Sequence, residues 1–237
     1  MQLNNGLIFM SDTRTNAGLD NISQFCKLFT FHKKDERFIT LLAAGNLATT
    51  QSVISVLEER NKTPLEGGSS LLDAPSMFQV ARLVGDTLRE VIQRNSDVGQ
   101  KADATFHATF IVGGQIHGSG PKLFLIYPEG NFIEANIDSP YFQIGETKYG
   151  RPILLRAYDA DMSWEAAIKL LLISFDSTVK ANLSVGLPLD MQVYRRDSFE
   201  CMHRKRIYAE DPYYMSVSQG WGAALKSAFD KLPDFQL

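Results

Sequence analysis

The chain has 237 residues, of which 44% are hydrophobic, 11% aromatic and 22% charged, with a formal net charge of −3 at pH 7. This size and composition allow a substantial buried core, and they exclude disorder, which goes with low hydrophobicity and high net charge. The weak acidic balance also excludes a strongly basic nucleic-acid binder, because phosphate binding needs concentrated Lys and Arg.

The compartment can be inferred from what the sequence does not contain. Its two cysteines, Cys26 and Cys201, are too few for a disulfide framework and are typical of reduced thiols. No apolar run approaches the ~20 residues that span a bilayer. The first ten residues lack the basic region and cleavage site of a signal peptide. We therefore expect a cytoplasmic protein that binds neither membrane nor nucleic acid.

The first half of the chain predicts strands followed by helices. Three short apolar or alternating runs are typical of strands: Leu7–Met10, Phe25–Phe31 and Phe38–Ala44. Asn46 can then cap a helix over residues 47–60, and apolar residues at helical spacing predict a second helix over 75–91.

The second half predicts strands, a long helix, two further strands and a last helix. The expected elements are strands at 106–112, 122–127 and 132–135 with a Gly-rich break at 113–120, a helix at 164–179, strands at 187–195 and 202–208, and a helix from 211 to 232. Strands grouped apart from helices favour an antiparallel α+β fold over a doubly wound parallel one. No linker or internal repeat is evident, so we expect a single domain over residues 1–237.

Several familiar catalytic signatures are absent. The Gly-rich stretch 113–120 lacks the Lys of a phosphate-binding loop, and Ser177–Lys180 matches S-x-x-K without its partner motifs. The four histidines show no metal-ligand spacing. Nucleotide and metal chemistry are therefore not expected.

Charged residues stand in the most apolar part of the N-terminal region. Asp12 and Arg14 follow directly on the first expected strand, and Lys27 lies inside the second. Charges in buried strands are costly unless they are paired. On spacing alone, a structural ion pair at the strand ends is the simpler explanation.

These residues also resemble the proteasome β-subunit pattern. In that family an Asp-x-Arg and a Gly follow the first strand, a Lys lies on the second, and an Ala-Gly pair ends the third. The corresponding residues are Asp12-Thr-Arg14 with Gly18, Lys27, and Ala44-Gly45. The stretches SDTRTNAGLDNIS, AAGNLATTQSV and NLSVGLP are most similar to the bacterial proteasome-like family called Anbu, and the likeness covers nearly the whole chain. It implies the four-layer αββα sandwich of N-terminal-nucleophile hydrolases.

The resemblance implies a specific chemistry. An N-terminal Thr attacks a carbonyl while its own α-amine, with an ordinary pKa near 8, acts as the base. A nearby Lys disfavours protonation of that amine, and an Asp holds the Lys. By resemblance Asp12 and Lys27 take these roles, and the Gly45 backbone N–H donates to the oxyanion.

The nucleophile itself is not among the residues before Asp12, since the first Thr in the chain is Thr13. In the family the Thr opens the strand that ends at the Asp, which requires roughly five residues before Met1 at ~3.3 Å each. Either the start is assigned too late, or the chain is naturally short and non-catalytic. We expect the late start, with an upstream stretch beginning Met-Thr, because Asp12, Lys27 and Gly45 are all present.

The second half of the implied site departs from the family pattern. Glu146 stands where proteasome β subunits carry a Ser after a Gly. Ser184 fits the family's second Ser, whereas the expected Asp falls on Ala181 with Asn182 next to it. By resemblance the substrate lies along the strand edge at Thr15 and Asn16, with Ala43 and Leu47 lining the side-chain pocket.

The function expected from this resemblance is that of a threonine-type hydrolase subunit, cleaving peptide or related amide bonds without metal or organic cofactor. Peptide or protein substrates would be enclosed in a homo-oligomeric ring or spiral. Two stretches suit burial at an interface: Leu170–Ile173 is apolar all round, and Phe78–Ile92 mixes apolar with charged residues. The alternative is a non-catalytic assembly subunit in which Asp12 and Lys27 form a structural pair.

Overall fold

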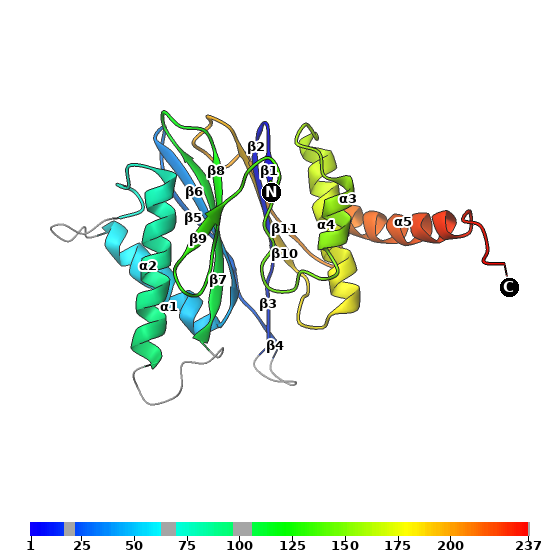
Figure 1. The fold of residues 1–237 in the computed structure, drawn as a ribbon, viewed down its shortest axis with the longest axis horizontal. Helices are drawn as coiled ribbons and strands as arrows, with labels where there is room; N and C mark the ends of the chain where they lie inside the picture. The colour runs from blue at the N-terminus through cyan, green and yellow to red at the C-terminus, as the bar shows by residue number, and fades with distance from the viewer. Residues whose placement is uncertain (17–21, 63–69, 97–105, 237) are drawn as a thin grey trace.

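The structure is a computed structural model, and it describes residues 1–16, 22–62, 70–96 and 106–236, apart from the side chains of Asn16, Ile22 and Ser96. Figure 1 shows four layers, with two sheets face to face and helices covering both outer faces. The expected α+β fold with an αββα sandwich is confirmed.

Both sheets are antiparallel. The first, called the β2 sheet, has the strand order β1 (Gln2–Leu3), β2 (Gly6–Asp12), β10 (Leu189–Arg195) and β11 (His203–Ile207). The second, called the β6 sheet, has the order β5 (Leu28–Lys33), β6 (Arg37–Gly45), β7 (Ala108–Ile116), β8 (Lys122–Ile126) and β9 (Phe132–Glu134). A separate ribbon pairs β3 (Arg14–Asn16) with β4 (Ile22–Gln24).

The helices divide between the two outer faces. Helices α1 (Leu47–Lys62) and α2 (Met77–Ser96) cover the β6 sheet, whereas α3 (Arg151–Ala157) and α4 (Trp164–Ala181) cover the β2 sheet (Figure 1). Helix α5 (Pro212–Phe229) starts beside α4 and extends away from the body. Among the described residues, no helix is both long enough and apolar enough to cross a bilayer.

Strand β2 is apolar on both faces because each face meets a different core. Leu7 and Phe9 point into the core between the sheets, while Ile8 and Met10 pack toward α4. A strand covered on both sides reads as a continuous apolar run, which is the pattern that the sequence shows. Asp12, at the end of β2, is where this run gives way to charge.

The sequence predicted that the Gly-rich stretch 113–120 would separate two strands. The structure shows that this is wrong for the first part of the stretch. Gly113 and Gly114 lie inside β7, which runs on to Ile116. A Cβ on Gly113 would lie 2.7 Å from the Phe9 ring and 2.8 Å from Leu123. The glycine therefore lets the ring of the facing sheet approach β7, so its role is in packing and not in a turn.

Polar side chains also connect the two sheets. The Gln192 amide of β10 donates from Nε2 to Thr40 Oγ1 at 2.6 Å, and its Oε1 accepts from Thr30 Oγ1 at 2.9 Å. The Tyr194 hydroxyl donates to Gln115 Oε1 at 2.7 Å. Burial raises the pKa of Tyr194 to about 12, so it remains a neutral donor at physiological pH. These bonds fix how the sheets lie on each other, because a slipped register would leave buried polar groups unpaired.

The structure also bears on three predictions about the second strand and helices α1 and α4. The second strand begins at Leu28, so Lys27 lies just before it and not inside it. Asn46 caps α1 as expected, its Oδ1 accepting from Thr49 N at 2.9 Å. Within the run Leu170–Ile173, the three leucines are buried inside the chain itself, since α4 lies between the β2 sheet and residues of α3 and α5.

We predict that Gly113→Ala lowers the free energy of unfolding by about 1–3 kcal/mol, because the added methyl overpacks the core between the sheets. The urea unfolding midpoint measures this loss. Gly220→Ala is the matched control, since a Cβ there meets nothing within 4 Å. An unchanged midpoint for Gly113→Ala would contradict the packing role.

Candidate functional site

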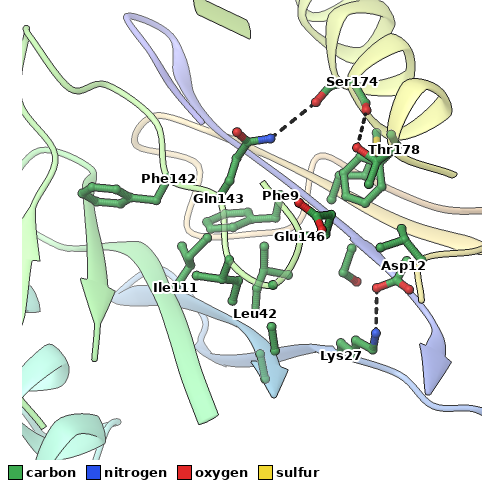
Figure 2. Close-up of a pocket in the computed structure, with 18 of the residues that line it drawn as sticks. Phe9, Asp12, Lys27, Leu42, Ile111, Phe142, Gln143, Glu146, Ser174 and Thr178 are labelled. Carbon is green, nitrogen blue, oxygen red and sulfur yellow. Dashed lines mark hydrogen bonds and ion pairs between the residues drawn. The ribbon is translucent and has the colours of Figure 1, made fainter. Parts of the chain in front are cut away.

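An ion pair joins the ends of the two sheets. Lys27 Nζ lies 2.7 Å from Asp12 Oδ1 and also donates to the Arg14 carbonyl oxygen at 2.6 Å (Figure 2). The side chains are only 20% and 12% exposed, respectively. Burying one of these charges without the other would cost free energy of desolvation, and the ion pair offsets that cost.

The Asp12 carboxylate is held by backbone donors as well. Its Oδ2 accepts from Arg14 N at 3.2 Å and from Gly186 N at 3.3 Å. The Arg14 guanidinium donates to the Leu183 carbonyl oxygen at 2.8 Å and lies so close to Gly186 that a Cβ there would be 2.4 Å from Nε. The loop after α4 is therefore fixed against the end of β2.

Gly45 ends β6 in a conformation that favours glycine. Its φ is +107°, and a Cβ there would lie 2.4 Å from the His107 carbonyl oxygen. Two residues earlier, Ala43 N donates to the Lys27 carbonyl oxygen at 3.1 Å. Because N–H directions repeat every second residue along a strand, the Gly45 N–H points to the same edge, beyond the start of β5.

Glu146, Asn182 and Ser184 form a connected chain of hydrogen bonds. Asn182 Nδ2 donates to Glu146 Oε2 at 2.8 Å, and Ser184 N donates to Asn182 Oδ1 at 2.8 Å. The hydrogen bond from the Lys148 backbone N–H is the main cause that lowers the pKa of Glu146, and the Asn182 amide adds to it. Glu146 is therefore a carboxylate at neutral pH.

Asp176 belongs to a different part of the molecule. It is buried, and it accepts from Tyr214 Oη at 3.1 Å and from Lys180 Nζ at 2.9 Å. It therefore fastens α5 to α4.

A cavity of about 350 Å³ collects most of the residues predicted for the site. Those that line it are Asp12, Thr15, Lys27, Ala43, Gly45, Leu47, Glu146 and Ser184. Asn182 reaches it through Glu146. Asn16 belongs to β3, and its side chain lies outside the part of the chain that the structure describes.

The cavity passes through the layer of the β2 sheet. One wall comes from the core between the sheets at Phe9, Leu42 and Ile111, and the opposite wall comes from α4 at Ser174 and Phe175 (Figure 2). It therefore extends alongside β2, between the core of the two sheets and α4. We call this space the strand slot.

Strand β1 leads into the strand slot. Met1 N donates to the Ile8 carbonyl oxygen at 2.9 Å, and Gln2 N donates to the Pro140 carbonyl oxygen at 2.9 Å. The short strand is thus held between β2 and the chain at 140. The slot continues along the same line, between Met10 and Asp12 of β2 and the segment 141–146.

Three buried polar atoms that line the slot lack a hydrogen-bond partner among the described residues: Ser11 Oγ, Thr15 Oγ1 and Gln143 Oε1. Gln143 also donates from Nε2 to Ser174 Oγ at 3.4 Å (Figure 2). Unpaired polar atoms in a cavity suit an occupant that carries its own donors and acceptors. The sequence predicted no site role for either residue: Ser11 opens the stretch SDTRTNAGLDNIS, but the resemblance assigns it no role, and Gln143 lies in no motif.

The described residues contain no cluster of three or more His, Cys, Asp or Glu side chains arranged to hold a metal ion. The chemistry available at the slot is that of a Lys–Asp pair, backbone N–H groups, a carboxylate and small hydroxyls.

Comparison with solved structures finds close relatives. Anbu (ancestral beta-subunit) from Yersinia bercovieri shares 48% identity over 100% of this chain and 98% of that chain, with a TM-score of 0.93. Anbu from Hyphomicrobium sp. strain MC1 shares 47% identity, covering 100% and 97%, with a TM-score of 0.91. The helical assembly of the Anbu complex from Pseudomonas aeruginosa shares 44% identity, covering 100% and 96%, with a TM-score of 0.91. No protein-family model and no curated protein matches the chain.

We predict that Asn182→Ala raises the pKa of Glu146 toward its ordinary value of 4.5, because one of the donors that stabilise the carboxylate is lost. The shift is partial, since the Lys148 N–H remains. A ¹³C NMR titration of the Glu146 carboxyl carbon measures both proteins. A pKa at or above 4.5 in the unmodified protein would contradict this network.

Proposed function

Because the chain belongs to the Anbu family of proteasome-related β subunits, we propose that it is a threonine-type hydrolase subunit that cleaves peptide or related amide bonds. The observation that carries this proposal is the strand slot, which leads from Met1 to the Asp12–Lys27 pair.

The register of β1 gives the distance along the slot. Gln2 pairs with Leu7 and Leu3 with Gly6, and Met1 exchanges hydrogen bonds with Ile8. A segment continuing this ladder would have its fourth and fifth residues before Met1 opposite Asp12 and Thr13. We propose that the active protein carries such a segment and that its first residue is the nucleophilic Thr.

The chemistry follows from what surrounds that position. The Thr hydroxyl attacks the substrate carbonyl carbon and passes its proton to the Thr α-amine. Lys27, held by Asp12, disfavours an extra proton on the free amine and so keeps it available as a base. The oxyanion accepts from the Gly45 N–H. The C–N bond then breaks as the leaving amine takes the proton, and water hydrolyses the ester that remains.

The remaining residues have supporting roles in this proposal. Glu146, held by Asn182, takes the place of the family's Ser, and Ser184 stands at the far end of the same hydrogen-bond chain. The substrate lies along β3 at Thr15 and Asn16, where the unpaired Thr15 hydroxyl gives it a partner. Ala43 and Leu47 line the pocket for its side chain. No metal or organic cofactor takes part.

We also propose that copies of this single domain, residues 1–237, assemble in the cytoplasm into a homo-oligomeric ring or spiral that encloses the sites. The relative from Pseudomonas aeruginosa is described as a helical assembly, which supports this proposal. The alternative is a non-catalytic assembly subunit. The Asp12–Lys27 pair is compatible with it, because the two charges already compensate each other and need no further partner.

The proposal predicts that protein from its native host begins about five residues before Met1, with Thr first after removal of an initiator Met. Intact-mass measurement and N-terminal sequencing of that protein decide it. Recovery of an unextended Met1 would leave only the non-catalytic alternative.

In protein carrying the Thr, we predict that Lys27→Ala slows covalent labelling by a peptide electrophile by about 10²–10⁴-fold, the usual contribution of acid–base catalysis. Lys33→Ala is the matched control, because Lys33 is a surface residue at the end of β5. Lys27→Met combined with Asp12→Asn removes both charges and tests whether an unpaired Asp12 causes misfolding. Labelling at the normal rate by Lys27→Ala would contradict the proposed site.

A further inference from the structure

Glu146 is the carboxylate of the strand slot whose charge no cation compensates within the described chain. Its Oε1 accepts from the Lys148 backbone N–H and its Oε2 accepts from Asn182 Nδ2, each at 2.8 Å. Among the described residues, no Lys, Arg or His side chain forms a salt bridge with Glu146. Asp12, in contrast, pairs with Lys27 (Figure 2). Each carboxylate oxygen can accept more than one hydrogen bond, so Glu146 is fixed in place and still available to a cation.

The segment that ends at Glu146 follows the slot from β1 onward. Every residue from Tyr141 to Glu146 lines the slot, and Gln2 N donates to the Pro140 carbonyl oxygen at its beginning. Six residues separate Pro140 from Glu146. Six steps back from Gln2 lead to the fifth position before Met1, which is where the proposed function requires the Thr. Two extended chains side by side keep step with each other, so Glu146 is expected beside the α-amine of that Thr.

The other charged or titratable groups around this position leave Glu146 as the uncompensated charge. Those among the described lining residues are Asp12, Arg14, Cys26, Lys27 and Tyr141. The Asp12 and Lys27 charges compensate each other, and the Arg14 guanidinium and the Cys26 thiol each donate to a backbone carbonyl oxygen. Burial raises the pKa of Tyr141, so its hydroxyl is neutral. Helix α4 adds no charged side chain to the described lining.

We propose that the Glu146 carboxylate binds the ammonium group that forms when the Thr α-amine takes the proton of the Thr hydroxyl. This inference rests on the function proposed above and gives Glu146 a direct part in it. In that step the O–H bond breaks and an N–H bond forms, the hydroxyl oxygen bonds to the substrate carbonyl carbon, and the carbonyl π electrons pass to the oxyanion. Glu146 takes no proton, and its fixed negative charge stabilises the positive charge as it develops.

Lys27 and Glu146 then act on the amine in opposite directions. The Lys27 charge disfavours the ammonium, and the Glu146 charge favours it. A neighbouring carboxylate raises the pKa of an amine, so the amine becomes a stronger base but is unprotonated only at higher pH. The Ser of the proteasome β-subunit pattern brings no charge to this position. Glu146 therefore predicts a rate that keeps rising with pH into the alkaline range.

The pH profile of covalent labelling tests this role. In protein carrying the Thr, the rate of labelling by a peptide vinyl sulfone is measured across the neutral and alkaline range. We expect Glu146→Gln, which removes the charge and keeps the size of the side chain, to lower the midpoint of the profile by about one pH unit. We also expect the rate at high pH to fall by about threefold, because the amine is a weaker base. The two rates converge at low pH, where more of the amine is unprotonated in the variant.

The matched control is Glu129→Gln, which leaves the profile unchanged. Glu129 is exposed in the turn between β8 and β9 and does not line the slot. Circular dichroism checks that each variant remains folded.

A measurement on the amine itself separates the effect of charge from activity. Competitive acetylation by trace acetic anhydride, followed by mass spectrometry of the N-terminal peptide, gives the pKa of the Thr α-amine in each protein. We expect the lower pKa in Glu146→Gln. A lower rate with an unchanged midpoint and an unchanged amine pKa would show a role in packing alone and would overturn the inference.

The two proposals fail in different ways. A normal profile and a normal amine pKa in Glu146→Gln would overturn the role of Glu146 and leave the proposed function intact. No labelling of the unmodified protein at any pH would overturn the proposed function itself, and the role of Glu146 with it.

Discussion

The arrangement of the site depends on the Asp12 carboxylate. It accepts from the Lys27 ammonium and from the backbone N–H groups of Arg14 and Gly186, which belong to three different segments. These contacts join the end of the β2 sheet to the start of the β6 sheet and to the loop after α4. Removing one partner would leave a sheltered charge without compensation, which is more costly than losing the same pair from the surface.

The strand slot lies next to the Asp12–Lys27 pair, and both residues line it. Two cores meet across it, and its buried Ser11, Thr15 and Gln143 oxygens lack partners within the described chain. Each such atom costs about 1–3 kcal/mol while it is unpaired. In the function that we propose, a strand that continues β1 supplies backbone donors along the slot and also brings the Thr beside Asp12.

Much of this fold could be predicted from the sequence, because most of its strands and helices produce a local pattern of apolar residues. Strands covered on both faces read as apolar runs, and α1, α2 and α4 repeat their apolar residues at helical spacing. Asp12 and Lys27 were visible as charges in an apolar region. What could not be predicted depends on contacts between distant residues. Nothing local indicates that Gly113 meets Phe9, that Gly186 N donates to Asp12, or that Gln143 lines the slot.

The apolar character of the helices has two different physical origins, and only the structure separates them. In α4 the run Leu170–Leu172 is buried by its own chain, so it needs no partner. In α5 only the first turns join the core next to α4, through Tyr214 and Val217, whereas every position from residue 222 to residue 236 is exposed. Figure 1 shows this second part of α5 leaving the body. An apolar stripe therefore indicates an interface only after the packing of its own chain has been accounted for.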